Sequence, residues 1–147
     1  THLEAELVAQ LRQAGRLTIS LVALCDDQIV GHIALSPVTV GSATGCLGLA
    51  PVAVLPQQQR RGIGKQLVRA GLQLCREAQV GLIVVLGDPA YYGRFGFRPA
   101  ADWNLSDAYG GGAAFQALEL RAGAVPASGG QVDYAPEFAL FGAEDSR

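Results

Sequence analysis

The stretch Gln59-Arg60-Arg61-Gly62-Ile63-Gly64-Lys65 combines three cations with two glycines. It follows an apolar run that ends at Pro56, and it opens a segment with helical periodicity. The N-terminus of a helix leaves backbone N–H groups unpaired and carries a partial positive charge, so it attracts anions. Glycine lets the backbone approach a ligand closely. The stretch therefore predicts an anion site and favours a phosphate group.

Two common phosphate-binding fingerprints do not fit this stretch. A dinucleotide fingerprint needs G-x-G-x-x-G, but Leu67 stands where the third glycine belongs. A Walker loop needs G-x-x-x-x-G-K-[ST]. Gly64 and Lys65 match its end, but Gln59 and Gln66 replace the first glycine and the Ser or Thr. Both nucleotide-binding classes are excluded.

What remains is Q-x-x-G-x-G, and here the sequence resembles the GCN5-related N-acetyltransferase (GNAT) superfamily. A second motif, Tyr92-Gly93-Arg94-Phe95-Gly96-Phe97, matches the Y-x-x-x-G-F pattern of that family. The longer run Leu86–Phe97 is similar to the bacterial YhbS-type branch. The resemblance covers roughly Leu17 to the end of the chain.

The resemblance implies acetyl-CoA as cosubstrate, no metal, and direct transfer of the acetyl group to a primary amine. It implies that a bulged central strand and its parallel neighbour splay into a V that holds the pantetheine arm. A backbone N–H of the central strand would serve as the oxyanion hole, and Tyr92 as the general acid. The implied cofactor-binding residues are Val52, Ala53, Val54, Gln59, Arg60, Arg61, Gly62, Ile63, Gly64 and Lys65.

The general base does not show in the sequence. Cys46–Leu55, the expected central strand, holds no carboxylate and no histidine, although many members of the family carry a Glu there or nearby. Asp88 and Glu119 are candidates, but a helix cap and a solvated strand residue are the favoured interpretations. Ordered water and prior loss of the proton to solvent stay open. His32 is favoured as a packed strand residue, and Cys46 as a structural thiol.

Several residues have two interpretations. Tyr91 is expected in the core or in a substrate wall, and Arg94 is either a ligand contact or an exposed helix residue. Trp103 and the loop Tyr109–Gly112 are candidates for the wall of the acceptor pocket. The alternatives to an N-acetyltransferase are a non-catalytic acyl-CoA sensor, favoured by the missing strand carboxylate, and a transferase that uses another acyl-CoA.

The fold predicted around these motifs is α/β (α+β in some schemes): a mixed, mostly antiparallel sheet flanked by helices, with a splayed parallel pair at its centre. Gly48 and Pro51 predict a bulge in the central strand. The helix after Lys65 should run about five turns. Its predicted buried face is Ile63, Leu67, Gly71, Leu74 and Ala78. The expected helices are Thr1–Ala14, the helix after Lys65 and Ala90–Phe95. The expected strands are Leu17–Cys25, Ile29–Val40, Cys46–Leu55, Val80–Gly87, Ala114–Leu120 and Gln131–Ala135. The expected turn is Gly41–Gly45, and the expected loops are Ala100–Gly112 and Arg121–Gly130.

Composition limits the number of domains, the kinds of partner and the cellular location. The chain has 147 residues, 50% of them hydrophobic, which favours a single domain over residues 1–147. A net charge of −2 provides no global field for nucleic acid or for an acidic membrane. The three cysteines are widely spaced and show no zinc or disulfide pattern, which favours a cytoplasmic location. The resemblance implies that an N-terminal strand and helix are missing, and it is compatible with a homodimer.

Overall fold

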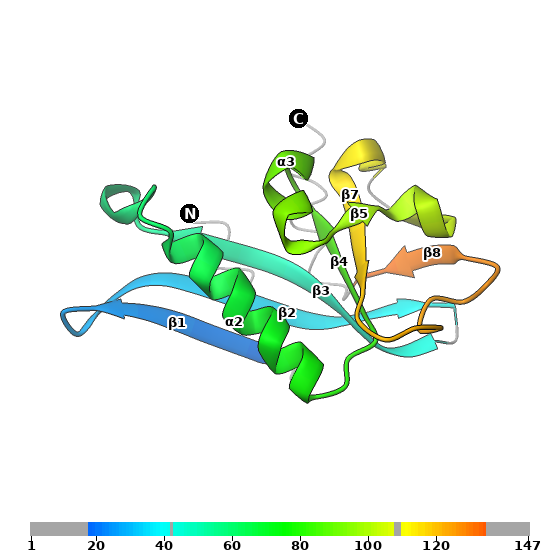
Figure 1. The fold of residues 1–147 in the computed structure, drawn as a ribbon, viewed down its shortest axis with the longest axis horizontal. Coiled ribbons are helices and arrows are strands. Elements are labelled where there is room, and N and C mark those ends of the chain that lie inside the picture. The colour runs from blue at the N-terminus through cyan, green and yellow to red at the C-terminus, as the bar shows by residue number, and fades with distance from the viewer. Residues whose placement is uncertain (1–17, 42, 108–109, 135–147) are drawn as a thin grey trace.

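The computed structural model describes residues 18–41, 43–107 and 110–134, which form a mixed eight-stranded sheet with two α-helices (Figure 1). The strand order is β5-β7-β4-β3-β2-β8-β6, and β1 also pairs with β2. The strands are β1 (Ile19–Cys25), β2 (Gln28–Val40), β3 (Ala43–Val54), β4 (Leu82–Leu86), β5 (Arg98–Pro99), β6 (Leu105–Asp107), β7 (Phe115–Glu119) and β8 (Gly130–Asp133). The helices are α2 (Ile63–Glu77) and α3 (Pro89–Tyr92), with 3-10 turns η1 (Pro56–Gln58), η2 (Gly93–Phe95), η3 (Ala100–Trp103) and η4 (Gly112–Ala114). The predicted helix Thr1–Ala14 lies outside the described residues.

The predicted hairpin of the first two strands is confirmed. β1 pairs antiparallel with β2 along its whole length. Asp26 and Asp27 form the turn with φ of 51° and 67°. Asp tolerates this left-handed region better than most residues other than glycine, because its short side chain bonds locally to the backbone.

β3 begins earlier than the sequence predicts. Val40 pairs with Ala43, so the connecting turn is shorter than Gly41–Gly45 and Cys46 lies inside the strand. Gly45 has a φ of 76° within β3. A glycine that indicated a turn in the sequence is therefore an irregular point in a strand that continues.

The predicted irregularity in the middle of β3 is confirmed. Ile33 of β2 pairs with Val52, whereas Leu35 pairs with Leu49. A step of two residues in β2 thus opposes a step of three in β3, which is a bulge. The Ala50–Pro51 peptide bond, which is cis, lies within it.

β3, α2 and β4 form the predicted crossover, and β3 and β4 are parallel. Their ladder is short, since it joins only Cys46 to Leu82, Leu47 to Ile83 and Gly48 to Val84. Farther on, β3 stays paired with β2 as far as Val54, and β4 stays paired with β7 as far as Leu86. Over the described residues no further pair joins β3 to β4. The two strands therefore part beyond Gly48, as the resemblance implies.

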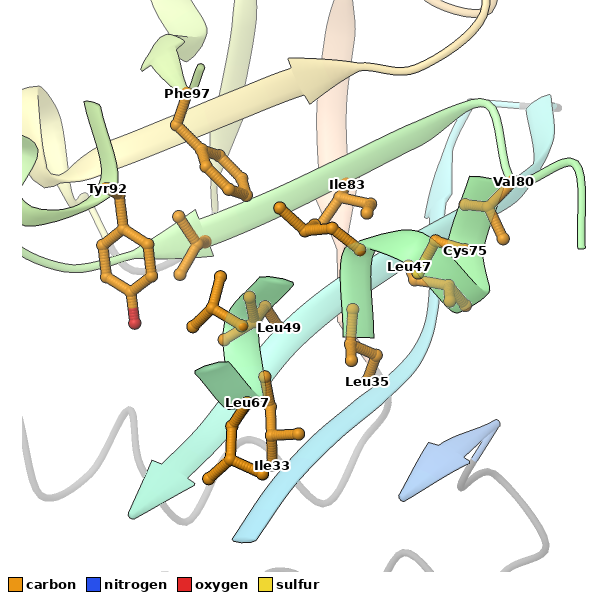
Figure 2. Packing of buried hydrophobic residues seen from close by; sticks show 13 residues of the cluster. Ile33, Leu35, Leu47, Leu49, Leu67, Cys75, Val80, Ile83, Tyr92 and Phe97 are labelled. Carbon is orange, nitrogen blue, oxygen red and sulfur yellow. The ribbon is translucent and has the colours of Figure 1, made fainter. Parts of the chain in front are cut away.

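Helix α2 lies across one face of the sheet, over β1, β2 and β3 (Figure 1). Its predicted buried face is partly wrong. Leu74 is 38% exposed and Ala78 is the exposed C-cap. The helix has 15 residues, about four turns instead of five. Side chains of β2 and β3 such as Ile33 and Leu49 pack beneath it (Figure 2). The residues that it buries are Leu67, Val68, Gly71, Leu72 and Cys75.

The second half of the chain forms a second core cluster and contains one strand, β6, that the sequence did not predict. Part of the predicted loop Ala100–Gly112 is the 3-10 turn η3 and the strand β6, which pairs in parallel with β8. A strand of three residues is too short to show periodicity, and its partner lies far away in sequence. The strands predicted as Ala114–Leu120 and Gln131–Ala135 are confirmed as β7 and β8, although Ala135 lies outside the described residues. Val84, Phe115 and Val132 belong to this second core cluster.

Candidate active site

The predicted anion site lies where β3 passes into α2. The Gln59 amide donates a hydrogen bond to the carbonyl of Val54, 3.0 Å away, and so ties the connection to the end of β3. Gly62 is the N-cap of α2 with a φ of 81°. The first bond of the helix runs from the Gln66 N–H to the Gly62 carbonyl. The N–H groups of residues 63–65 precede that bond, so they are directed out of the helix end.

A cavity of about 350 Å³ opens at this helix end. Its lining includes three cations, Arg60, Lys65 and Arg94, and no carboxylate among the described residues. Of the predicted cofactor residues, Arg61, Val52 and Ala53 do not line it. The complete lining is Val54, Gln58, Gln59, Arg60, Gly62, Ile63, Gly64, Lys65, Tyr91 and Arg94. The charge and the N–H groups suit a phosphate or a diphosphate.

The two glycines of the motif leave room for a ligand in different ways. A Cβ at Gly62 would meet no atom within 4 Å, but its φ of 81° is one that side chains strain to adopt. A Cβ at Gly64 would lie 3.3 Å from the Tyr91 hydroxyl and 3.7 Å from a methyl of Val54. A larger side chain there would occupy part of the cavity that Gly64, Tyr91 and Val54 line.

The parted strands supply a second part of the site. Val52, Ala53 and Val54 pair with Ile33, His32 and Gly31 of β2, so one edge of this segment is occupied. The other edge faces β4, with which it forms no pair in the described structure. Backbone groups along this edge are available to an extended ligand that would add to the sheet like a strand.

Tyr92 lies beyond the end of β4, on the short helix α3. The Asp88 carboxylate caps this helix by accepting from the Ala90 N–H at 2.9 Å, which confirms its favoured interpretation. The Tyr92 side chain is 8% exposed and packs edge-to-face on Phe97, with its hydroxyl turned away from that ring (Figure 2). A Cβ at Gly87 would overlap the Tyr92 ring, so the glycine at the strand end makes room for it. Burial, with a smaller contribution from Tyr91, raises the pKa of Tyr92 to about 12.

Tyr91 and Arg94 belong to the cavity, a role that sequence reasoning left open. The Arg94 guanidinium lies over the Tyr91 ring, 5.0 Å from its centre, and both residues line the cavity. Burial raises the pKa of Tyr91, and Arg94 partly opposes this shift. Gln58 also lines the cavity and was not predicted. Its position after Pro56 carries no sequence signal, whereas Tyr91 stands beside a recognised motif residue.

The residues considered as a base have structural partners. The Glu119 carboxylate accepts a hydrogen bond from the Val125 N–H at 3.1 Å. The ring of His32 bonds to the Ser20 hydroxyl at 2.9 Å, across the β1–β2 ladder. Cys46 is buried, and burial raises the pKa of its thiol although Arg121 opposes the shift. Within the described residues no group of His, Cys, Asp and Glu could hold a metal ion.

The predicted acceptor wall is not brought to the cavity. The Trp103 side chain packs against the second core cluster and under the Arg98 guanidinium, 5.2 Å from the ring centre. Trp103 is not in the cavity lining. Tyr109 of the loop Tyr109–Gly112 lies outside the described residues. No helix of the described structure is long and apolar enough to cross a membrane.

A bulged β3, a parallel neighbour that parts from it, and a cation-rich cavity at the following helix define the architecture of the acetyltransferase class. The chain matches the Acetyltransferase (GNAT) family over residues 2–97 and belongs to it. It is therefore an N-acetyltransferase of the acyltransferase group EC 2.3.1.-.

Particular relatives agree with this family. The uncharacterized N-acetyltransferase YhbS of Escherichia coli K12 is 41% identical over 141 residues, which is 94% of this chain and 84% of the relative. The crystal structure of E. coli YhbS in complex with CoA matches with a TM-score of 0.88 and 40% identity, covering 93% of this chain and 78% of that one. The crystal structure of a GNAT family acetyltransferase from Brucella melitensis in complex with acetyl-CoA matches with a TM-score of 0.76 and 45% identity. The match covers 92% of this chain and 77% of that one.

Proposed function

We propose that this chain moves an acetyl group from acetyl-CoA to a primary amine by direct attack in a ternary complex. The observation that carries the proposal is the cation-lined cavity at the start of α2, placed beside the segment where β3 and β4 have parted. The relatives bound to CoA and to acetyl-CoA support the same ligand class.

The cavity fits the pyrophosphate of the cosubstrate. The N–H groups of residues 63–65 donate to its oxygens, and Arg60 and Lys65 balance its charge. Gln59 acts on the loop, because its amide is bonded to the Val54 carbonyl. Arg61 is exposed outside the lining and adds charge only at longer range.

The free edge of β3 fits the extended pantetheine arm and the thioester. Alternate residues of Val52, Ala53 and Val54 direct their backbone groups to the edge that faces β4, and the Val54 carbonyl is already bonded to the Gln59 amide. A backbone N–H there would donate to the thioester oxygen, on which negative charge builds as the amine attacks. The bulge at residues 50–51 separates this segment from the part of β3 that pairs with β4.

Tyr92 assists departure of the sulfur. With a pKa of about 12 its phenol is protonated at neutral pH and can donate a hydrogen bond. An ordinary thiol has a pKa of about 8.5, roughly 3.5 pKa units below that of Tyr92. Complete transfer of the phenol proton to a thiolate is therefore unfavourable. The shift therefore favours a hydrogen bond that stabilises the thiolate. The nitrogen loses one proton when the amide forms, and the sulfur gains one, so the reaction balances.

The amine is expected to lose its proton through water or before it binds. β3 contains no Asp, Glu or His. Asp88 is engaged in capping α3, and Glu119 accepts from Val125. A base supplied by solvent makes turnover rise with pH as the free amine becomes more abundant.

The experiment that tests this mechanism compares the two adjacent tyrosines. Tyr92→Phe should lower kcat on the order of a hundredfold with CoA affinity retained, because it removes a donor that acts mainly on the leaving sulfur. Acetyl-CoA-dependent thiol release over a panel of amines and peptides measures kcat, and calorimetry measures CoA binding. Tyr91→Phe is the matched control, since Tyr91 lines the cavity; it should alter binding more than kcat. Normal turnover in Tyr92→Phe would show that Tyr92 does not assist departure of the sulfur.

The second candidate is a non-catalytic acyl-CoA sensor, and the observation that favours it is the β3 segment without a carboxylate. Tight CoA binding, with thiol release that never exceeds background over the panel, would select it. A preference for succinyl-CoA or a longer acyl-CoA would instead select a transferase of another acyl group. A cytoplasmic location and a homodimer remain predictions.

A further inference from the structure

A second cavity, of about 370 Å³, lies beside the first along α2. Its lining contains three arginines and no carboxylate among the described residues. The lining residues are Arg69, Leu72, Gln73, Arg76, Arg94 and Phe95. Arg94 lines both cavities, so one guanidinium joins them. The chain as a whole has a net charge of −2, so this concentration of positive charge is local. It favours binding of an anion.

Aromatic rings hold two of these arginines. The Arg94 guanidinium lies over the Tyr91 ring at 5.0 Å, and the Arg69 guanidinium lies over the Phe95 ring at 5.9 Å. A guanidinium stacked on a ring keeps its N–H groups directed outward in its own plane. Less side-chain freedom is then lost when a phosphate binds in bidentate fashion. The described residues show no carboxylate paired with either arginine.

The two cavities follow one another along α2, an arrangement that suits a ligand with phosphates on both sides of a ribose. Arg69 follows Gly64 by five residues, which is about 7.5 Å along the helix axis. CoA carries a pyrophosphate on the 5′ side of its ribose and a single phosphate on the 3′ side. With the pyrophosphate at the N-terminus of α2, a 3′-phosphate on the same ribose would be directed to the neighbouring cavity that Arg69 lines. Arg76 also lines the second cavity, but it stands seven residues beyond Arg69, about 10.5 Å farther along the helix axis from the first cavity.

We propose that Arg69 and Arg94 bind the 3′-phosphate of CoA and make this chain selective for CoA over 3′-dephospho-CoA. The proposal rests on the proposed function, since it takes the first cavity as the pyrophosphate site. Arg94 contacts both phosphate groups, whereas Arg69 contacts only the 3′-phosphate. Substitution of Arg69 should therefore affect the 3′-phosphate subsite alone.

Calorimetric titration of the full chain with CoA and with 3′-dephospho-CoA tests the proposal without any need for turnover. The wild type should bind CoA about tenfold more tightly, the expected effect of a charge-assisted hydrogen-bonded contact. In Arg69→Gln the ratio of the two affinities should fall toward one, with the affinity for dephospho-CoA unchanged. In Arg94→Gln both affinities should fall, and the ratio should fall as well.

Arg98→Gln is the matched control, because it removes the same charge from an exposed arginine that lines neither cavity. It should keep the wild-type ratio; an equal loss in Arg98→Gln and Arg69→Gln would show a general field effect and overturn the proposal. Equal binding of the two ligands by the wild type would also overturn it and would leave the proposed function intact. If neither ligand binds the wild type, the proposed function itself fails. Gln preserves helix propensity, and the wild-type comparison holds even if a variant misfolds.

Discussion

At the scale of single residues, the cation-lined cavity depends on backbone conformation as much as on charge. Arg60 and Gly62 both have positive φ, at 66° and 81°, just before α2 begins. Alternation of left-handed residues with ordinary ones turns successive N–H groups toward a common point, which is a favourable arrangement for anions. The cations of the motif strengthen a site that the main chain has already shaped.

Gly62→Ala should weaken CoA binding on the order of tenfold, because a methyl group enters the cavity and the left-handed backbone becomes strained. Gly45→Ala is a matched control. Gly45 has a similar φ of 76°, and its Cβ would also meet no atom within 4 Å, but it lies in β3 away from the cavity. Both variants should lose about 1–2 kcal/mol of stability, measured by chemical denaturation, and only Gly62→Ala should lose CoA affinity by calorimetry. Unchanged affinity in a folded Gly62→Ala variant would contradict the phosphate site.

At the scale of elements, α2 links the cavity to the core. Its N-terminus opens on the cavity, while its buried face packs on β1, β2 and β3. A Cβ at Gly71 would lie 3.2 Å from a methyl of Leu35, so the helix approaches the sheet closely there. Packing along the helix and the bond from Gln59 to the Val54 carbonyl together position the N–H groups of its first turn relative to the end of β3.

Two neighbouring leucines of α2 test which face is buried. Leu72 is 3% exposed, whereas Leu74 is 38% exposed. Leu72→Ala should lower the free energy of unfolding by about 2–5 kcal/mol, since it leaves a cavity in the core. Leu74→Ala should lower it by less than about 1 kcal/mol. Denaturant titration measures both, and equal losses would contradict the face that the structure shows.

At the scale of the whole molecule, buried ionisable groups make the fold sensitive to alkali. Burial raises the pKa of the Cys75 thiol to about 11, with Arg76 opposing the shift, and that of Tyr92 to about 12. The folded chain thus holds both protons more tightly than the unfolded chain. The corresponding stability is complete below the ordinary pKa values, near 9 and 10, and is lost as pH rises through 11 and 12.

The free energy of unfolding should fall between about pH 9 and pH 11 through Cys75, by at most about 2–3 kcal/mol. Cys75→Ala should be less stable at neutral pH, because it loses core contacts, but should show a shallower alkaline decline. Cys25→Ala is the control, since it removes a half-buried thiol at the end of β1 and leaves Cys75 in place. Urea denaturation at fixed pH values gives the profiles. Identical slopes in the wild type and Cys75→Ala would refute the role of Cys75.

The sequence by itself determined the features that depend on local chemistry. Three such features are the motif at residues 59–65, the cap at Asp88 and the β1–β2 turn. Each depends on adjacent residues, because glycine and short polar side chains act within one or two positions. The apolar runs of β3 and β4 also identified the central strands, since a strand buried on both faces must be apolar throughout. The family followed from these motifs and from their spacing.

Only the tertiary structure decided the features that depend on distant partners. The apolar residues of α2 allow more than one face, and contact with β2 selected the one with Leu72 and Cys75. β6 exists because β8 pairs with it, and Tyr91 reaches the cavity because α3 packs beside Gly64. Arg94 likewise lines both cavities together with residues of α2, although it lies far from them in sequence. Such contacts join residues far apart in sequence, and no local pattern records the geometry that brings them together.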